Sequence, residues 1–115
     1  MESISDVDID PQGRFKYILI KVVDPISKVE KYIVRGYGRC EYHADIYDEV
    51  EPEIKKAGLK SICEGGGRIL HENDKKKLTV FGYSTGYGKA DHAKSVEILK
   101  KKFVNYQVDW SNDGY

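Results

Sequence analysis

Hydrophobic and polar residues alternate with two different periods along the chain, and these periods predict strands and helices. Alternating, β-branched runs indicate strands at residues 15–23, 31–37, 60–64, 68–71, 77–83 and 106–110. Apolar positions spaced i, i+4, i+7 and i+11 predict amphipathic helices over residues 43–57 and 92–103. Pro52 falls inside the first helix and favours a kink, and Gly58 suits its end.

The order of these elements, β-β-α-β-β-α-β, predicts one α+β (mixed α/β) domain over residues 1–115, with both helices packed on one mixed β-sheet. Three glycines at residues 65–67 interrupt the third strand, which resumes at Arg68. Residues 1–13 are acidic and polar, so we expect a lead-in that frays. A chain of 115 residues fits one domain and buries enough surface to need no metal or disulfide.

Charge and composition exclude several classes of protein. Lys and Arg number 19, as do Asp and Glu, and this balance argues against binding nucleic acid or anionic lipid through bulk charge. No run of 18 apolar residues indicates a membrane span. Residues 1–11 lack the pattern of a signal peptide, so we expect a cytoplasmic protein with reduced Cys40 and Cys63. We also expect a monomer, because no apolar stripe is left over.

Several motifs of phosphate and metal chemistry are nearly present, but each fails on spacing or on residue type. Four residues separate Cys63 from Arg68, whereas the loop of a thiol phosphatase needs five. Gly88-Lys89 is followed by alanine instead of the Ser or Thr that a nucleotide P-loop requires. The three histidines have no ligand-like spacing, so we predict neither a metal site nor a cofactor.

His43 is the first candidate for chemistry, because it falls at the predicted start of the first helix. A helix N-terminus offers N–H groups and partial positive charge, which attract an anion and disfavour a protonated imidazole. A neutral histidine near physiological pH can accept a proton or act as a nucleophile. The alternative interpretation is a histidine that only packs in the core.

Other candidates cluster at strand ends and glycines. Lys16 shares a strand face with apolar residues, which places it at the rim of a pocket or makes it a simple edge lysine. Arg35 and Arg68 each lie beside glycine, where they bind a ligand or form surface ion pairs. The loop at residues 82–88 is either an anion-binding nest to which Ser84 adds a hydroxyl, or a plain strand-to-helix turn.

Together these residues resemble the 14-kDa phosphohistidine phosphatase family, which includes the Janus and Ocnus proteins. The resemblance extends from Asp6 to Tyr115. The matching motifs are F-K-Y at 15–17, I-V-R-G-Y at 33–37, E-Y-H-A-D-I-Y-D at 41–48, G-G-G-R-I at 65–69, G-Y-S at 82–84, H-A at 92–93 and N-D-G-Y at 112–115.

The resemblance implies a metal-independent hydrolase without a cofactor, which removes phosphate from phosphohistidine in proteins and releases inorganic phosphate. The family's essential histidine corresponds to His43 and its substrate-binding lysine to Lys16. Its phosphate-binding loop corresponds to Ser84, Thr85 and Gly86, with Arg35 and Arg68 as further charges that draw the substrate or brace the site. Relatives often carry a bulkier residue and then alanine where this chain has Thr85-Gly86.

Three questions stay open at the level of sequence. His43 acts either as a general base on water, which we favour, or as a transient acceptor of the phosphoryl group. The competing class of function is a module that binds a phosphorylated or acidic peptide without hydrolysis, and a relative whose catalysis has lapsed is a third reading. The preference between phosphohistidine and phospholysine is not encoded in any motif.

Overall fold

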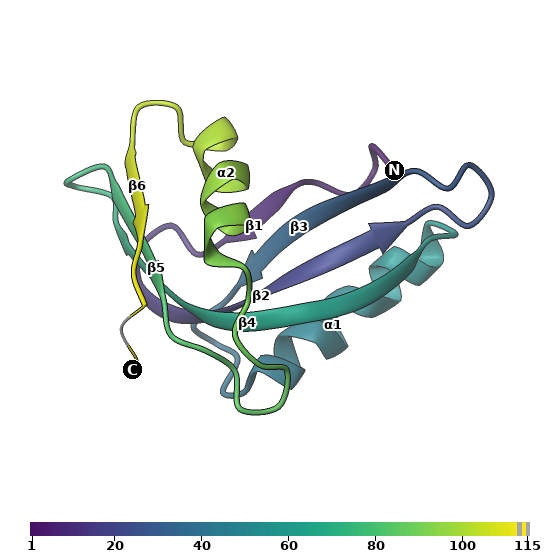
Figure 1. Cartoon of the computed structure of the whole chain (residues 1–115), viewed down its shortest axis with the longest axis horizontal. Coiled ribbons are helices and arrows are strands. Elements are labelled where there is room, and N and C mark those ends of the chain that lie inside the picture. Colours follow the sequence, from purple (N-terminus) through teal and green to yellow (C-terminus); the bar gives the residue numbers. More distant parts are fainter. Residues whose placement is uncertain (113, 115) are drawn as a thin grey trace.

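The structure is a computed structural model that describes residues 1–112 and residue 114. Asp113 and Tyr115, part of the family-like segment at 112–115, lie outside the described residues. The described residues form six strands and two helices: β1 (Val7–Ile9), β2 (Gly13–Val23), β3 (Glu30–Gly36), α1 (His43–Lys56), β4 (Lys60–Glu72), β5 (Lys77–Phe81), α2 (His92–Lys102) and β6 (Gln107–Trp110) (Figure 1). This arrangement confirms the predicted α+β fold.

The strands form one mixed sheet in the order β1-β3-β2-β4-β5-β6. The inner strands β3, β2, β4 and β5 pair antiparallel, whereas the edge strands β1 and β6 run parallel to their neighbours. Strands β2 and β4 form the long centre of the sheet, and their register pairs Lys16 with Arg68. Cross-strand partners project on the same face, so these two cations lie side by side.

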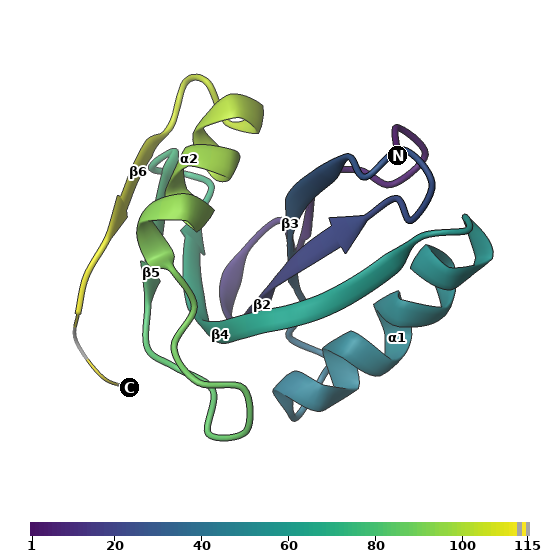
Figure 2. The same ribbon diagram turned by 45° about the vertical axis from the view of Figure 1, so that its right-hand side comes forward.

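The helices cover opposite faces of this sheet, because β2 is apolar on both sides. Its odd-numbered residues from Phe15 to Leu19 share a buried cluster with Leu99 of α2. Its even-numbered residues from Ile18 to Val22 share a second cluster with residues of α1. Successive side chains of a strand point to opposite faces, and Figure 2 shows α1 and α2 on either side of the curved sheet. The chain therefore has a separate core under each helix.

Strand β4 is continuous, which corrects the expectation that the glycines at 65–67 interrupt it. Leu19 pairs with Gly65 and Ile20 with Cys63, so Glu64 is the extra residue of a β-bulge. Gly65 has a φ of 140°, a backbone conformation that residues with side chains rarely adopt. The glycines therefore bend the strand and let it continue. At the next hairpin, β5 ends at Phe81 instead of the predicted residue 83.

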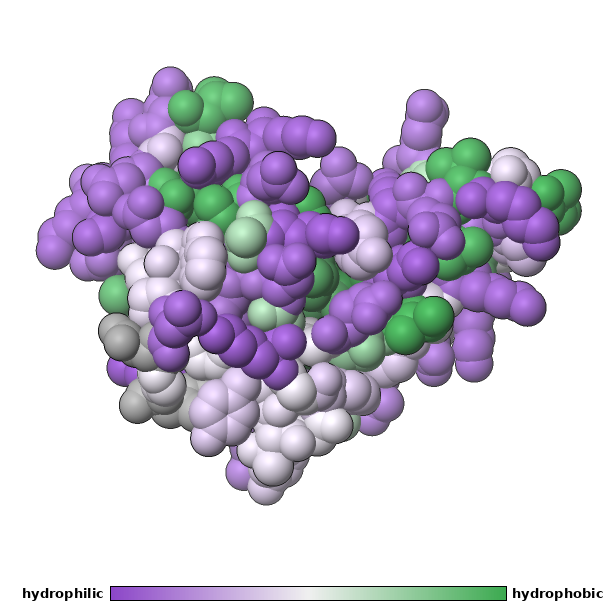
Figure 3. Space-filling view, viewed as in Figure 1, coloured by the Kyte–Doolittle hydropathy of each residue, from purple (hydrophilic) through white to green (hydrophobic). Residues whose placement is uncertain are grey.

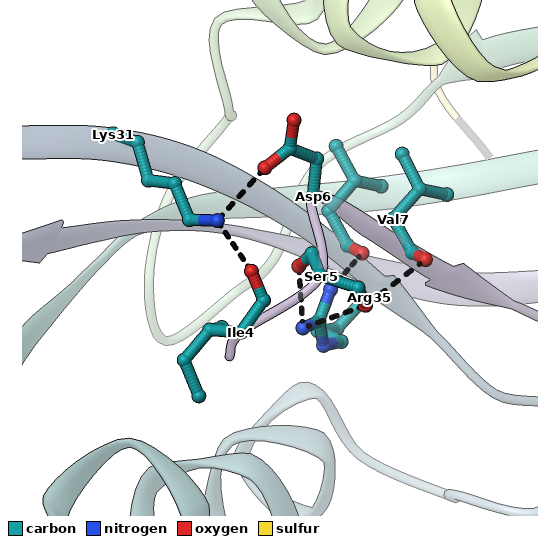
Figure 4. A network of polar contacts seen from close by, with 7 residues as sticks. Ile4, Ser5, Asp6, Val7, Lys31 and Arg35 are labelled. Atoms are coloured by element: carbon teal, nitrogen blue, oxygen red, sulfur yellow. Dashed lines mark hydrogen bonds and ion pairs between the residues drawn. The ribbon is translucent and has the colours of Figure 1, made fainter. Parts of the chain in front are cut away.

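The N-terminal segment, which the sequence pattern predicts as a fraying lead-in, contains strand β1 and the buried side chains of Ile4 and Val7. Figure 4 shows the contacts that attach it to β3. Lys31 Nζ donates to the carboxylate of Asp6 at 2.9 Å and to the carbonyl of Ile4. The buried guanidinium of Arg35 donates to the carbonyl of Ser5 at 2.8 Å. A three-residue strand that pairs in parallel leaves no turn signal in the sequence, which explains why the pattern missed it.

The start of α1 agrees with the expectation from the sequence. Helix α1 begins at His43 and continues through Pro52 to Lys56, and Gly58 follows it with a φ of 79°. The two cysteines are free thiols. Neither of the described helices has both the length and the apolar character that crossing a membrane requires.

The contacts of Arg35 predict that it stabilises the fold. We expect Arg35→Met to lower the free energy of unfolding by about 1–3 kcal/mol, because the carbonyl of Ser5 loses its donor. Arg39→Met is the matched control, since Arg39 is exposed and its ion pair with Glu49 contributes at most about 1 kcal/mol. Urea denaturation of both variants measures the difference. An equal or larger loss in Arg39→Met would contradict this role.

Candidate active site

A cavity of about 730 Å³ opens where the N-terminus of α1 meets the middle of the sheet and the loop between β5 and α2. Figures 1 and 2 both show this loop beside the first turn of α1. The cavity is lined by most of the residues that the sequence proposes for the site: Lys16, His43, Arg68, Ser84, Thr85 and Gly86. Residues more than 60 positions apart in the chain thus meet in one place.

The start of α1 is fixed by the residues that precede and follow His43. Tyr42 is the N-cap residue, and its N–H donates to the carboxylate of Asp45 at 2.9 Å. An acidic side chain in the first turn also compensates the positive end of the helix dipole. The first N–H groups of a helix have no acceptor within the helix, and Ala44, in that first turn, lines the cavity.

The imidazole of His43 is 7% exposed and is hydrogen-bonded to the backbone of β4. Its Nε2 lies 2.9 Å from the carbonyl oxygen of Gly67. Because a carbonyl only accepts, Nε2 carries the proton, and in the neutral ring Nδ1 is left as the proton acceptor. A Cβ on Gly66 would lie 2.7 Å from Cδ2 of His43, so a glycine there is what lets the ring rest on the strand.

Burial and neighbouring cations keep His43 neutral. Desolvation is the largest cause that lowers the pKa of His43, and the positive charges of Lys16 and Arg68 lower it further. The hydrogen bond to Gly67 acts in the opposite direction but is outweighed. A neutral ring with a free Nδ1 is the form that takes up a proton.

Lys16 is held at the wall of the cavity by its own hydrogen bond. Its Nζ donates to the carbonyl of Glu41 at 2.5 Å and lies 6.0 Å from the centroid of the Tyr42 ring. Lys16 and Arg68 are both half-buried, and both line the cavity. Their charges act on any anion that enters.

The loop between β5 and α2 has a fixed frame and an exposed tip. The N–H of Ser84 donates to the carbonyl of Gly88, whose N–H donates back to the carbonyl of Ser84. The hydroxyl of Ser84 accepts from the N–H of Tyr87 at 3.1 Å, so its own hydrogen stays available to a ligand. Among the described residues, no acceptor bonds the N–H groups of Thr85 or Gly86. The available amides are therefore those two, and not that of Ser84.

The loop carries little charge of its own. In Figure 3 its surface, at the bottom of the view, is pale because serine, threonine, tyrosine and glycine compose its tip. Tyr42, Tyr83 and Tyr87 also line the cavity, and sequence reasoning did not assign them to it. Their positions next to His43 and around Ser84 are the signal that would have found them.

A buried network on the α2 face fixes the beginning of this loop. Nε2 of His92 donates to the carbonyl of Gly82 at 2.8 Å, so its Nδ1 accepts from the hydroxyl of Tyr17 at 2.7 Å. The same hydroxyl lies 2.9 Å from Oγ of Ser95. Burial raises the pKa of Tyr17 and lowers that of His92, so both groups stay neutral.

Arg35 is the one proposed site residue that does not line the cavity. Its guanidinium donates to the carbonyls of Ser5 and Val34, at the β1 edge of the sheet. Burial is the main cause that lowers its pKa. The structure therefore assigns Arg35 to the attachment of the N-terminal segment.

Cys63 does not have the environment of a reactive thiol. Cys63 lies within strand β4, and burial raises the pKa of its thiol to about 11, whereas a thiolate nucleophile needs a lowered pKa. No group of three or more His, Cys, Asp or Glu side chains among residues 1–112 and 114 is arranged to hold a metal ion.

Comparison with known proteins shows the family of this chain. The family model of the Janus/Ocnus family matches residues 1–107. The chain belongs to the Janus/Ocnus family. It is 50% identical to the 14 kDa phosphohistidine phosphatase of Sus scrofa, over all of this chain and 95% of the relative. The human protein of the same name is 51% identical over 97% of this chain and 94% of its own length.

Family members also include proteins named for a different property. The sex-regulated protein janus-A of Drosophila pseudoobscura pseudoobscura is 51% identical over 95% of this chain and 76% of its own length. The similarity to relatives of both names covers nearly the whole chain, so it includes every element that builds the cavity.

The environment of His43 predicts a lowered pKa that an NMR titration measures. We expect the pKa of His43 to lie below its usual value, and Lys16→Gln to raise it by removing a nearby positive charge. Lys100→Gln, which removes an exposed lysine of α2, is the matched control and should leave this pKa unchanged.

Because the folded chain resists protonation of His43, its contribution to stability is present above about pH 6.5 and is lost as the pH falls below that value. A pKa of His43 at or above the usual value would contradict the buried, neutral ring.

Proposed function

We propose that this chain is a protein phosphohistidine phosphatase, a hydrolase that breaks the N–P bond of phosphohistidine in protein substrates. Full-length relatives about half identical to it carry that name. The observation that carries the proposal is the position of His43, a buried neutral base in a cavity that also presents cations and unbonded amides. This combination suits a phosphoryl group that must be held and attacked by water.

The phosphoryl oxygens are held by the ammonium of Lys16, the N–H groups of Thr85 and Gly86, and the hydroxyl of Ser84, while Arg68 adds positive charge. The transition state of phosphoryl transfer spreads negative charge over these oxygens, so positioning and charge balance provide most of the catalysis. We infer that no metal ion is required, because these groups supply the positive charge. Because these donors are backbone N–H groups, the Thr85-Gly86 pair that distinguishes this loop still provides them.

In the favoured mechanism, His43 acts as a general base. Nδ1 takes a proton from water as the water oxygen bonds to phosphorus, and the N–P bond breaks with its electron pair going to the imidazole of the substrate. The released imidazole nitrogen then takes the proton from Nδ1 of His43, which returns to its neutral form. The hydrogen bond from Nε2 to Gly67 orients the ring and stabilises the positive charge that it acquires. The alternative is that Nδ1 itself bonds to phosphorus and forms a transient phosphohistidine.

We further propose that the protein acts in the cytoplasm as a monomer. Free thiols at Cys40 and Cys63 suit a reducing compartment. Equal numbers of acidic and basic residues give no bulk attraction to nucleic acid or to an anionic membrane. The partner is then a phosphohistidine-containing protein, which the local charges of the cavity recognise.

Release of inorganic phosphate from a phosphohistidine peptide, with a metal chelator present, tests this function. We expect the wild-type chain to release phosphate and His43→Ala to turn over at least about 10²-fold more slowly. Added imidazole should restore part of the activity of His43→Ala, because it replaces the missing base. Thermal unfolding of the variant serves as the control for its fold.

Tight binding of the peptide without release would contradict the proposal and favour a phosphopeptide-binding module. Near-normal turnover by a folded His43→Ala chain would contradict the role of His43. A single turnover with radiolabelled substrate, quenched in alkali, distinguishes the two mechanisms, since label on His43 would replace the general-base scheme by the covalent one.

Lys16→Gln tests whether the lysine binds phosphate. We expect the KM for a phosphohistidine peptide to rise about tenfold, because a charge-assisted hydrogen bond to the phosphoryl group is lost. Lys100→Gln removes the same charge from the α2 side of the sheet and should leave KM unchanged. Steady-state kinetics of both variants give the comparison, and an unchanged KM in Lys16→Gln would remove Lys16 from the phosphate site.

A further inference from the structure

A second, smaller hollow of about 300 Å³ adjoins the cavity, and we name it the side hollow. Its charged lining residues are Arg14, Lys16, Glu41 and Arg68. Lys16 and Arg68 line both spaces, so the side hollow continues the cavity across this pair of cations. A polypeptide whose phosphorylated residue occupies the cavity therefore has a charged space beside it.

Arg14 is the cation that belongs to the side hollow alone. It lies two residues before Lys16 on β2, so both side chains project on the same face. Its guanidinium carbon lies 5.0 Å from the centroid of the Phe81 ring on β5. Phe81 is the register partner of Arg68, which places the guanidinium of Arg14 across β4, next to Arg68. The ring supports the guanidinium and reduces its freedom.

The side hollow carries an excess of positive charge. Among the described residues, no carboxylate forms an ion pair with Arg14 or with Lys16. Glu41 is the acidic residue that lines the side hollow, against the two cations Arg14 and Lys16. The chain as a whole is neutral, with 19 basic and 19 acidic residues, so this excess is a local feature. It is too small to bind a polyanion and fits a single acidic group.

We propose that the side hollow binds the carboxylate of an Asp or Glu residue of the substrate, close in sequence to the phosphohistidine. This inference rests on the proposed function and specifies its substrate class. The planar guanidinium of Arg14 presents parallel N–H donors that match the two oxygens of a carboxylate. Because the two spaces share Lys16 and Arg68, an extended substrate reaches both with residues that are close in sequence.

Two phosphohistidine peptides test the proposal, one with glutamates at the positions that flank the phosphohistidine and one with glutamines there. We expect the wild-type chain to show a kcat/KM about fivefold higher for the glutamate peptide, as suits one exposed charge pair. Arg14→Gln should reduce this ratio to near one, whereas Lys100→Gln should keep it. Glu41→Gln should increase the ratio, because it removes the opposing carboxylate.

Equal kcat/KM values for the two peptides in the wild-type chain would overturn the proposal, as would a preference that Arg14→Gln retains. Hydrolysis of free phosphohistidine, which has no flanking residues, separates this result from the proposed function. If the wild-type chain hydrolyses free phosphohistidine but does not distinguish the peptides, only the side-hollow inference fails. If it hydrolyses neither free phosphohistidine nor the peptides, both fail.

Discussion

The contact between His43 and the backbone of β4 is the interaction on which the rest of the site depends. It requires a strand without side chains at the point of contact, and Gly66 provides this. The hydrogen bond to Gly67 sets which ring nitrogen carries the proton, and burial against the strand keeps the ring neutral. The same contact joins the first turn of α1 to the centre of the sheet. The packing of this ring against β4 therefore determines the position, the tautomer and the charge of His43.

Strand β2 positions two parts of the site, one from each face of the sheet. Lys16 projects toward the cavity on the α1 face, while the neighbouring Tyr17 projects to the α2 face and bonds His92. His92 in turn bonds the carbonyl of Gly82, where the loop begins. The loop and the lysine are thus positioned by adjacent residues of one rigid strand. This explains how a short loop with an exposed tip can present its amides in a fixed direction.

The neutrality of the chain and its anion-binding chemistry are compatible because the cations are concentrated. Lys16, Arg68 and Arg14 lie on one face of adjacent strands, although the whole chain carries no net charge. Lys16 and Arg68 are half-buried, so salt screens their charges less than those on the open surface, whereas Arg14 is exposed. Their arrangement therefore decides which anion is recognised, and the sum of charges only limits non-specific binding.

The sequence by itself determined the fold class, the start of α1 at His43 and the residues of the loop at 82–88, because these depend on local periodicity, capping and turn residues. It did not distinguish Arg35 from Arg68, since both are arginines beside glycine at strand residues. Only the tertiary structure directed Arg35 to the N-terminal segment and Arg68 to the cavity. Strand β1, the continuity of β4 and the place of Arg14 were likewise decided by long-range pairing. Such pairing joins residues that no local pattern relates.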